Sequence, residues 1–147
     1  MCSSDLDGRA RFVACDHHPP QEQPCELYPL TLTTGRLASQ WHTMTRTGKV
    51  QRLAKQAATP YVEIHPADAA THAIADGSSV RIRSRRGSIT VTARISERVT
   101  PGVVFIPMHW GDNYTTGGAI NIVTNDAYDP FSKQPEYKAC AVAIAAS

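Results

Sequence analysis

Residues 34–46 read Thr-Gly-Arg-Leu-Ala-Ser-Gln-Trp-His-Thr-Met-Thr-Arg and follow an apolar, β-branched stretch at residues 27–33. That stretch predicts a strand, which Gly35 ends. A glycine lets the backbone approach a ligand closely, so that amides and hydroxyls can surround an anion. Arg36 adds a planar, permanently charged fork that suits a phosphate, and Trp41 offers a face for stacking. The stretch therefore predicts either a loop for a phosphorylated ligand with a flat ring or an ordinary polar loop with one core tryptophan.

The composition is that of a single globular domain. The chain has 147 residues, of which 41% are hydrophobic and 19% are charged, and this length allows one core. No apolar run approaches the roughly 18 residues of a membrane-spanning helix, so no membrane segment is predicted. The formal net charge of +2 is too small to indicate nucleic acid as a partner. The arginines at residues 81–86 predict a solvated face.

The four cysteines predict neither a disulfide framework nor a metal site. They are Cys2, Cys15, Cys25 and Cys140, with no CxxC pair. Cys15 and Cys25, with the histidines between them, fit no closed zinc pattern, so no metal ligands are predicted. Cys140 lies in an apolar stretch and predicts a buried free thiol. A chain without an oxidised framework favours the cytoplasm.

Three segments are expected along the chain. Residues 1–6, Met-Cys-Ser-Ser-Asp-Leu, resemble the translated end of a common short-read sequencing adapter, and we expect a non-native start there. They lack the charged and apolar regions of a secretory signal. Residues 7–26 predict a lead-in segment, with a turn and an edge strand up to residue 13 and then a proline-rich connection. Residues 27–147 are expected to form the folded domain.

Hydrophobic alternation predicts a mainly β domain. Besides residues 27–33, strands are expected over residues 61–64, 80–84, 89–95, 103–106 and 137–145. Residues 50–58 and 66–74 predict short helices, the second capped by His65. Residues 111–135 lack periodicity, and a long irregular stretch in a compact domain tends to be functional. Short strands joined by turns predict a closed β-barrel.

Two motifs carry a resemblance to a known family. The first is Thr34-Gly35-Arg36 with residues 40–49, Gln-Trp-His-Thr-Met-Thr-Arg-Thr-Gly-Lys. The second is Met108-His109-Trp110 with residues 121–140, which include Asp-Pro-Phe-Ser-Lys-Gln-Pro-Glu-Tyr-Lys. Together they resemble the C-terminal domain of molybdopterin oxidoreductases, and the first is most similar to assimilatory nitrate reductases. The resemblance covers nearly the whole chain and implies a six-stranded double-psi β-barrel, the aspartate-decarboxylase-like fold.

The resemblance also implies a cofactor, molybdopterin guanine dinucleotide, present in the parent enzyme as the molybdenum bis form. The residues implied to bind it are Thr34, Gly35, Arg36, Gln40, Trp41, His42, Thr43, Asn121 and Lys138. Arginine and threonine hydroxyls suit a pyrophosphate, and Lys138 can meet a phosphate as a point charge. Asn121 either pairs with the edge of guanine or caps a loop.

Two further residues have a less defined role. The position of Met108 is implied to lie near substrate. His109 invites a role as proton donor, because an unperturbed imidazole titrates near neutral pH and nitrate reduction consumes protons. Its place beside Trp110 at a strand end fits packing equally well.

The parent enzyme implied by the resemblance is cytoplasmic and reduces nitrate to nitrite. Its electrons would come from ferredoxin, flavodoxin or an NADH-linked reductase. A 4Fe-4S cluster is expected in the N-terminal part of the parent, since this chain has no four-cysteine cluster motif. The chain alone is therefore expected to be inactive. The alternatives are the same domain of a formate dehydrogenase or another molybdopterin oxidoreductase, and a stand-alone β-barrel binding module.

Overall fold

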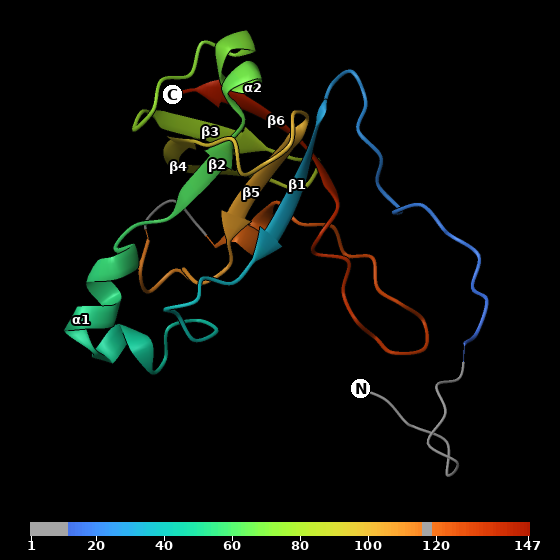
Figure 1. Cartoon of the computed structure of the whole chain (residues 1–147), viewed down its shortest axis with the longest axis horizontal. Helices are drawn as coiled ribbons and strands as arrows, with labels where there is room; N and C mark the ends of the chain where they lie inside the picture. The colour runs from blue at the N-terminus through green and yellow to red at the C-terminus, as the bar shows by residue number, and fades with distance from the viewer. Residues whose placement is uncertain (1–11, 116–118) are drawn as a thin grey trace.

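The folded chain is a closed barrel of six strands. The computed structural model describes residues 12–115 and 119–147. Around the barrel the strands follow the order β1-β5-β2-β4-β3-β6 (Figure 1). Their bounds are β1 Leu30–Gly35, β2 Tyr61–Ile64, β3 Ser79–Arg83, β4 Ser88–Ile95, β5 Val103–Pro107 and β6 Cys140–Ala146. The prediction of a mainly β, closed barrel is confirmed.

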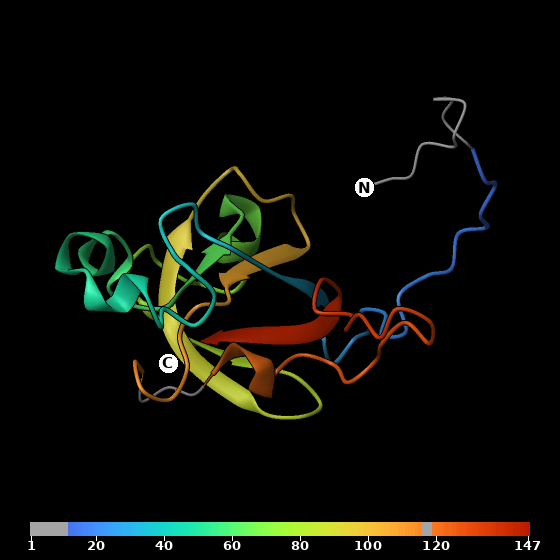
Figure 2. The same ribbon diagram turned by 90° about the horizontal axis from the view of Figure 1, so that it is seen from below.

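The pairing of the strands brings two long connections to one end of the barrel. Strands β1 and β5 are parallel, as are β2 and β4, and the other pairs are antiparallel. Parallel neighbours cannot be joined by a hairpin, so the chain must cross the barrel between them. Because β1 and β5 finish together and β6 begins beside them, residues 36–60 and 108–139 leave from this end (Figure 2). The arrangement is the double-psi β-barrel.

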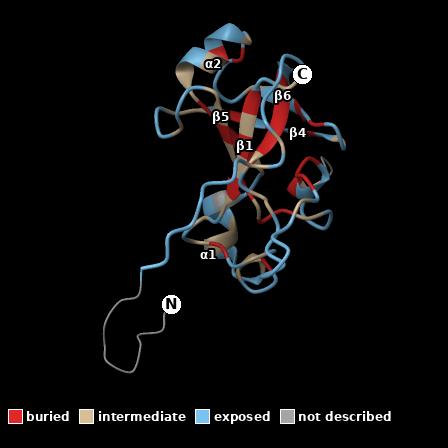
Figure 3. Ribbon diagram, turned by 90° about the vertical axis from the view of Figure 1, so that its right-hand side faces the viewer, coloured by how far each residue is buried: buried red, intermediate tan, exposed pale blue. Residues whose placement is uncertain are grey.

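The core fills the inside of the barrel. Buried apolar residues of all six strands form one cluster, and Figure 3 shows that the buried residues are concentrated in the strands. In β3, Val80 and Ile82 are fully buried while Arg81 and Arg83 are exposed, as the alternation predicts. Each large apolar side chain buried in this way contributes about 1.5–3 kcal/mol.

The helices are short. Helix α1 spans Gln51–Ala54 between the 3-10 turns η1 (Thr47–Lys49) and η2 (Lys55–Ala57), and α2 spans Pro66–Thr71. Helix α2 ends earlier than predicted because Ala73 adopts a left-handed φ of 52°. The predicted cap is confirmed, since the Nδ1 atom of His65 accepts the Ala67 N–H at 3.1 Å. In the described ranges, no helix has the length and apolar character needed to cross a bilayer.

Three predicted boundaries differ from the structure. Strand β1 begins at Leu30, after a tight backbone-paired turn between Cys25 and Tyr28, and continues to Gly35, which pairs with Pro107. Strand β6 begins only at Cys140. The predicted edge strand is wrong for residues 12 and 13, which are irregular, and its remainder lies outside the described residues, as do residues 1–6.

The thiol of Cys140 is buried, as predicted. Its side chain is inaccessible and its Sγ atom lies 3.2 Å from the Asn125 nitrogen, whose N–H points to it. Burial raises the pKa of the Cys140 thiol more than this N–H lowers it. The thiol therefore stays protonated and packs as a small apolar group.

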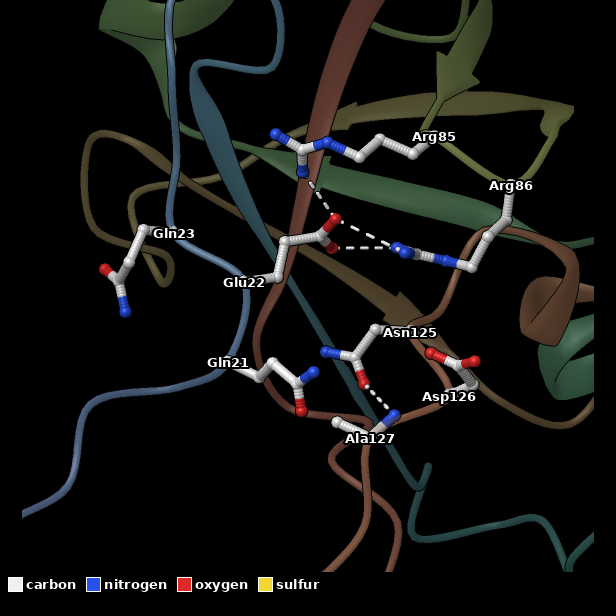
Figure 4. Close-up of a pocket in the computed structure, with 8 residues that line it drawn as sticks. All are labelled: Gln21, Glu22, Gln23, Arg85, Arg86, Asn125, Asp126 and Ala127. Atoms are coloured by element: carbon white, nitrogen blue, oxygen red, sulfur yellow. Dashed lines mark hydrogen bonds and ion pairs between the residues drawn. The ribbon is translucent and has the colours of Figure 1, made fainter.

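Glu22 ties the lead-in segment to the barrel. Its carboxylate oxygens lie 2.5 Å from Arg85 Nη1 and 2.7 Å from Arg86 Nη2, and one of them accepts the Ala141 N–H at 2.9 Å. The two arginines belong to the β3–β4 turn (Figure 4). Residues from three parts of the chain line the pocket around this carboxylate, which has a volume of about 300 Å³: Gln21, Glu22, Gln23, Arg85, Arg86, Asn125, Asp126 and Ala127.

The Glu22 contacts predict a pH-dependent contribution to stability. Burial alone raises the pKa of Glu22, but hydrogen bonds from Arg86, Ala141 and Arg85 outweigh it, so the pKa lies below its ordinary value of 4.5. The folded state then binds this proton more weakly than the unfolded state, and the stabilisation is lost as pH falls through the lowered pKa.

We expect Glu22→Gln to reduce the free energy of unfolding at neutral pH by about 1–3 kcal/mol, the scale of hydrogen bonds to a charged group. Urea denaturation of both proteins over a pH series measures the difference, which should disappear at acidic pH, where Glu22 of the wild type is itself protonated. A difference that is constant with pH would contradict the assignment.

Candidate functional site

The two sequence motifs meet at the end of β1. The Thr34 hydroxyl donates to the Tyr137 carbonyl at 3.0 Å, and the Lys138 ammonium donates to the Thr34 carbonyl. Thr34 is almost fully buried, whereas Lys138 is exposed. Barrel closure therefore joins the first motif directly to the end of the second.

Gly35 occupies a position that admits no side chain. A Cβ atom there would lie 2.7 Å from Cε2 of the Phe105 ring and 3.5 Å from Lys138 Nζ. The Gly35 carbonyl accepts the Met108 N–H at 2.9 Å, so the ends of β1 and β5 remain paired. The close approach explains why a glycine ends β1, and it leaves bare backbone beside the Lys138 ammonium.

Two cations flank this glycine. Arg36 follows it in the chain, and Lys138 contacts its other side. Both side chains are exposed, and neither has an ion-pair partner among residues 12–115 and 119–147. We call Gly35, Arg36 and Lys138 the cationic corner. Uncompensated cations beside a glycine backbone attract and orient an anion.

The loop after Gly35 rests on a small core of its own. Met44, Trp110 and Tyr61 are buried together, and Leu37 packs against them. Gln40 is also buried: its amide nitrogen donates to the Leu53 carbonyl at 2.7 Å, and its amide oxygen accepts from a neighbouring threonine hydroxyl. Of the residues implied to bind the cofactor, Thr34 and Gln40 thus make internal hydrogen bonds that support the loop.

Trp41 presents its ring at the surface of this loop. Its exposed fraction is 45%. The His42 ring lies edge-on at 4.6 Å between centroids, and the Arg46 guanidinium lies 5.5 Å from the indole centroid. Thr43 is exposed beside them. An accessible indole that neighbours hold in place can stack on a flat ring.

His109 lies beneath the loop and is completely buried. Its Nε2 atom accepts the Leu37 N–H at 2.8 Å, and its Nδ1 atom lies 2.5 Å from the His42 carbonyl oxygen. Both ring nitrogen atoms are therefore engaged by backbone, and the suggested role as proton donor stays a prediction. Met108 is half-buried and packs against the barrel core. The indole N–H of Trp110 is buried without a hydrogen-bond acceptor in the described part of the chain.

Asn121 lies on the 3-10 turn η3, which spans Ile120–Ile122. Its side chain is exposed and makes no hydrogen bond within the described ranges, so the loop-capping alternative has no contact to support it. Figure 1 shows η3 and the loop after β1 at the same end of the barrel, and Figure 2 shows them on different sides of that end. None of the contacts between described residues joins Asn121 to the cationic corner.

Sequence reasoning missed Asn125. This buried residue donates through its amide nitrogen to the Ala139 carbonyl at 2.9 Å and to Glu136 at 3.1 Å, and its amide oxygen accepts the Ala127 N–H at 3.1 Å. It therefore holds the irregular segment against the residues that carry Lys138. In the sequence, the local indication of this role is only that an amide side chain follows the apolar residues Ile122 and Val123.

Asp129 forms a turn. Its Oδ1 atom accepts the Ser132 N–H at 2.6 Å and the Phe131 N–H at 3.1 Å. The N–H and hydroxyl of Ser132 are the main reason that the pKa of Asp129 is lowered. Across residues 12–115 and 119–147, no group of three His, Cys, Asp or Glu residues is placed to hold a metal ion.

The chemistry of these side chains fits a nucleotide-like ligand. The cationic corner suits a phosphate or pyrophosphate, Trp41 offers a stacking surface, and the free amide of Asn121 offers both a donor and an acceptor. Asn121 lies across the same barrel end, which suits an extended ligand better than a compact one.

Comparison with known proteins gives one matching family and several long relatives. The model described as "Molydopterin dinucleotide binding domain" matches residues 30–141. The chain is 41% identical over 139 residues to a nitrate reductase of Klebsiella oxytoca, covering 95% of this chain and 16% of the relative. It is 46% identical over 140 residues to a nitrate reductase of Symbiobacterium thermophilum, covering 94% and 18%.

A formate dehydrogenase is nearly as similar. The F420-dependent formate dehydrogenase 1 subunit alpha of Methanococcus maripaludis is 40% identical over 138 residues, covering 94% of this chain and 20% of the relative. The chain thus spans a fifth or less of the length of these curated relatives. Among solved structures, acetylene hydratase from Pelobacter acetylenicus aligns with a TM-score of 0.76 and 17% identity over 90% of this chain and 21% of that one. That likeness concerns the fold alone.

Proposed function

The chain belongs to the family of molybdopterin dinucleotide-binding domains, and on this premise we propose that it holds the guanine form of that dinucleotide as one wall of a larger enzyme's cofactor site. The observation that carries the proposal is the cationic corner, where the Lys138 ammonium reaches the Thr34 carbonyl and lies beside Gly35. Residues far apart in the chain are brought together there, and among residues 12–115 and 119–147 no carboxylate forms an ion pair with either cation.

The proposed contacts divide the dinucleotide among the site residues. Arg36 and Lys138 hold the pyrophosphate, since charge-assisted hydrogen bonds to phosphate are the strongest available here. The exposed face of Trp41, with His42 and Thr43 beside it, meets a flat ring. The Asn121 amide reads the guanine edge. Thr34 and Gln40 support the loop from inside.

Within the larger enzyme this chain binds and orients rather than reacts. When bound, the molybdenum cofactor supplies the oxygen-atom transfer, and the protein supplies position and electrostatics. We place the 4Fe-4S cluster and the molybdenum ligand in other parts of that enzyme, so this chain alone is inactive.

The enzyme proposed is a cytoplasmic assimilatory nitrate reductase that reduces nitrate to nitrite. Ferredoxin, flavodoxin or an NADH-linked reductase would supply its electrons. This assignment is supported by the 41–46% identity to nitrate reductases and by the residues of the first motif. The alternative is a formate dehydrogenase, which is supported by the 40% identity to a formate dehydrogenase alpha subunit. Assays of the complete enzyme with nitrate and with formate decide between the two. Oxidation of formate without reduction of nitrate would contradict the assignment as a nitrate reductase.

The binding proposal is tested with guanosine diphosphate, which contains the guanosine and the pyrophosphate of the cofactor. We expect GDP to bind the 147-residue chain about tenfold more tightly than ADP, because amide recognition of a guanine edge contributes about 1–3 kcal/mol. Asn121→Ala should remove this preference while leaving the weaker, phosphate-driven affinity in place. Isothermal titration calorimetry measures both. Equal affinity for the two nucleotides in the wild type would contradict guanine recognition.

A further inference from the structure

A single buried imidazole spans the loop that carries the proposed ligand residues. His109 follows β5, whose end is paired with the end of β1, so the two chain segments leave the barrel side by side. From there the ring contacts the loop at two points, the Leu37 N–H at 2.8 Å and the His42 carbonyl oxygen at 2.5 Å. Leu37 directly follows Arg36, and His42 directly follows Trp41. The ring therefore fixes the backbone beside two residues proposed to contact the dinucleotide.

The hydrogen-bond pattern defines the protonation state of His109. Nε2 accepts an N–H, so it carries no proton, and the proton of the neutral ring must be on Nδ1, where it donates to the His42 carbonyl. A charged imidazolium would place a donor against the Leu37 N–H. The neutral ring has one donor and one acceptor, and it pairs with both backbone groups at once. An aliphatic or hydroxyl side chain cannot bridge the Leu37 N–H and the His42 carbonyl in this way.

The loop needs such support because its backbone is strained. His42 and Met44 have positive φ angles of 34° and 60°, a region that costs energy for residues other than glycine. Such conformations persist only where the surroundings fix them. Met44 is held by packing against Trp110 and Tyr61, and its N–H donates to the Trp41 carbonyl at 2.7 Å. The carbonyl of His42 is held by His109.

We propose that His109 is a positioning residue, which sets the loop conformation in which Arg36 and Trp41 meet the dinucleotide. The inference rests on the proposed function, and it gives His109 a task that needs no contact with ligand. The complete burial of the ring agrees with this, because a group without exposed surface in the free chain cannot touch a ligand at the surface.

The variants His109→Leu, His109→Gln and His109→Asn separate the two hydrogen bonds. Glutamine can place an oxygen near the Nε2 position and accept the Leu37 N–H. Asparagine can place an amide nitrogen near the Nδ1 position and donate to the His42 carbonyl. Leucine can do neither. Hydrogen exchange of the Leu37 amide, followed by NMR in the 147-residue chain, should show protection in the wild type and in His109→Gln. Protection should be lost in His109→Leu and His109→Asn.

The matching functional readout is GDP affinity. In His109→Leu we expect it to fall at least about tenfold, because apparent affinity falls with the fraction of molecules in the binding conformation. The glutamine and asparagine variants should lose less, since each retains one contact. Ile82→Ala is the control, because Ile82 is buried in β3 and its truncation destabilises the barrel without touching the loop.

The outcomes distinguish the two proposals. At a temperature where all variants are folded, Ile82→Ala should bind GDP as the wild type does. The positioning role is overturned if His109→Leu keeps wild-type affinity, or if Ile82→Ala loses as much affinity as His109→Leu. A wild-type chain that binds no GDP contradicts the proposed function instead. The Leu37 exchange rates then still test whether His109 fixes the loop.

Discussion

Removal of both cations at the cationic corner, in the double variant Arg36→Gln/Lys138→Met, is expected to weaken GDP binding by about a hundredfold or more. Each hydrogen bond between a charged donor and phosphate contributes about 1.5–3 kcal/mol, so two of them account for at least this factor. The effect should be large here because neither side chain has a carboxylate partner within the described residues that would offset its loss. Calorimetric titration with GDP measures the effect.

A matched control removes the same charge elsewhere. Arg52→Gln/Lys55→Met takes two exposed cations from α1 and η2, away from Gly35. The net charge changes equally in both double variants, so a general electrostatic effect would weaken binding in both. Binding near the wild-type level in the control, with a hundredfold loss at the corner, is the expected pattern. If the corner variant binds GDP as well as the control does, the phosphate assignment is wrong.

Leu32→Ala is expected to lower the free energy of unfolding by about 2–5 kcal/mol, the range for large-to-small substitutions in well-packed cores. Leu32 is fully buried in β1, where it pairs with Val104 of β5 and Cys140 of β6. Three strands therefore line the cavity that the substitution would leave. Because a closed barrel cannot collapse around such a cavity without disturbing its strand pairing, we expect the upper part of this range.

The measurement is urea denaturation, with Thr33→Ala as the control. Thr33 is the next residue of β1 and points to the other face, where it is only partly buried. Its truncation should cost less than about 1 kcal/mol, the span of strand propensities. Similar losses in the two variants would contradict the inward assignment of Leu32. A large loss in Leu32→Ala alone would also identify the barrel interior as the main source of stability.

The strands and the barrel were predictable because their signals are local. Alternation in β3 and β4 is visible within a few residues, and each strand was identified close to its observed bounds. Boundaries were less predictable where a distant partner sets them. Strand β1 extends to Gly35 because Pro107 pairs with it there. The end of α2 was missed for a local reason, the left-handed backbone at Ala73.

The binding roles of the candidate site residues stay predictions. The structure places Lys138 beside Gly35, next to Arg36 in the chain, and leaves Trp41 accessible in the loop that follows. Gln40 was expected to bind cofactor, and this role is untested; its buried amide makes hydrogen bonds with Leu53 and Thr47 within the loop. A sequence motif records which residues a site requires, but it does not separate those that face the ligand from those that support them.

The order of residues along the chain is enough to predict the strand pattern, the mainly β class and the two motifs that define the family. Which motif residues face outward depends on the folded barrel. Barrel closure brings Lys138 to Thr34, and the pairing of β1 with β5 places His109 beneath Leu37 and His42. The physical reason is range: alternation depends on near neighbours along one strand, whereas these contacts join residues that only the folded barrel brings within hydrogen-bonding distance.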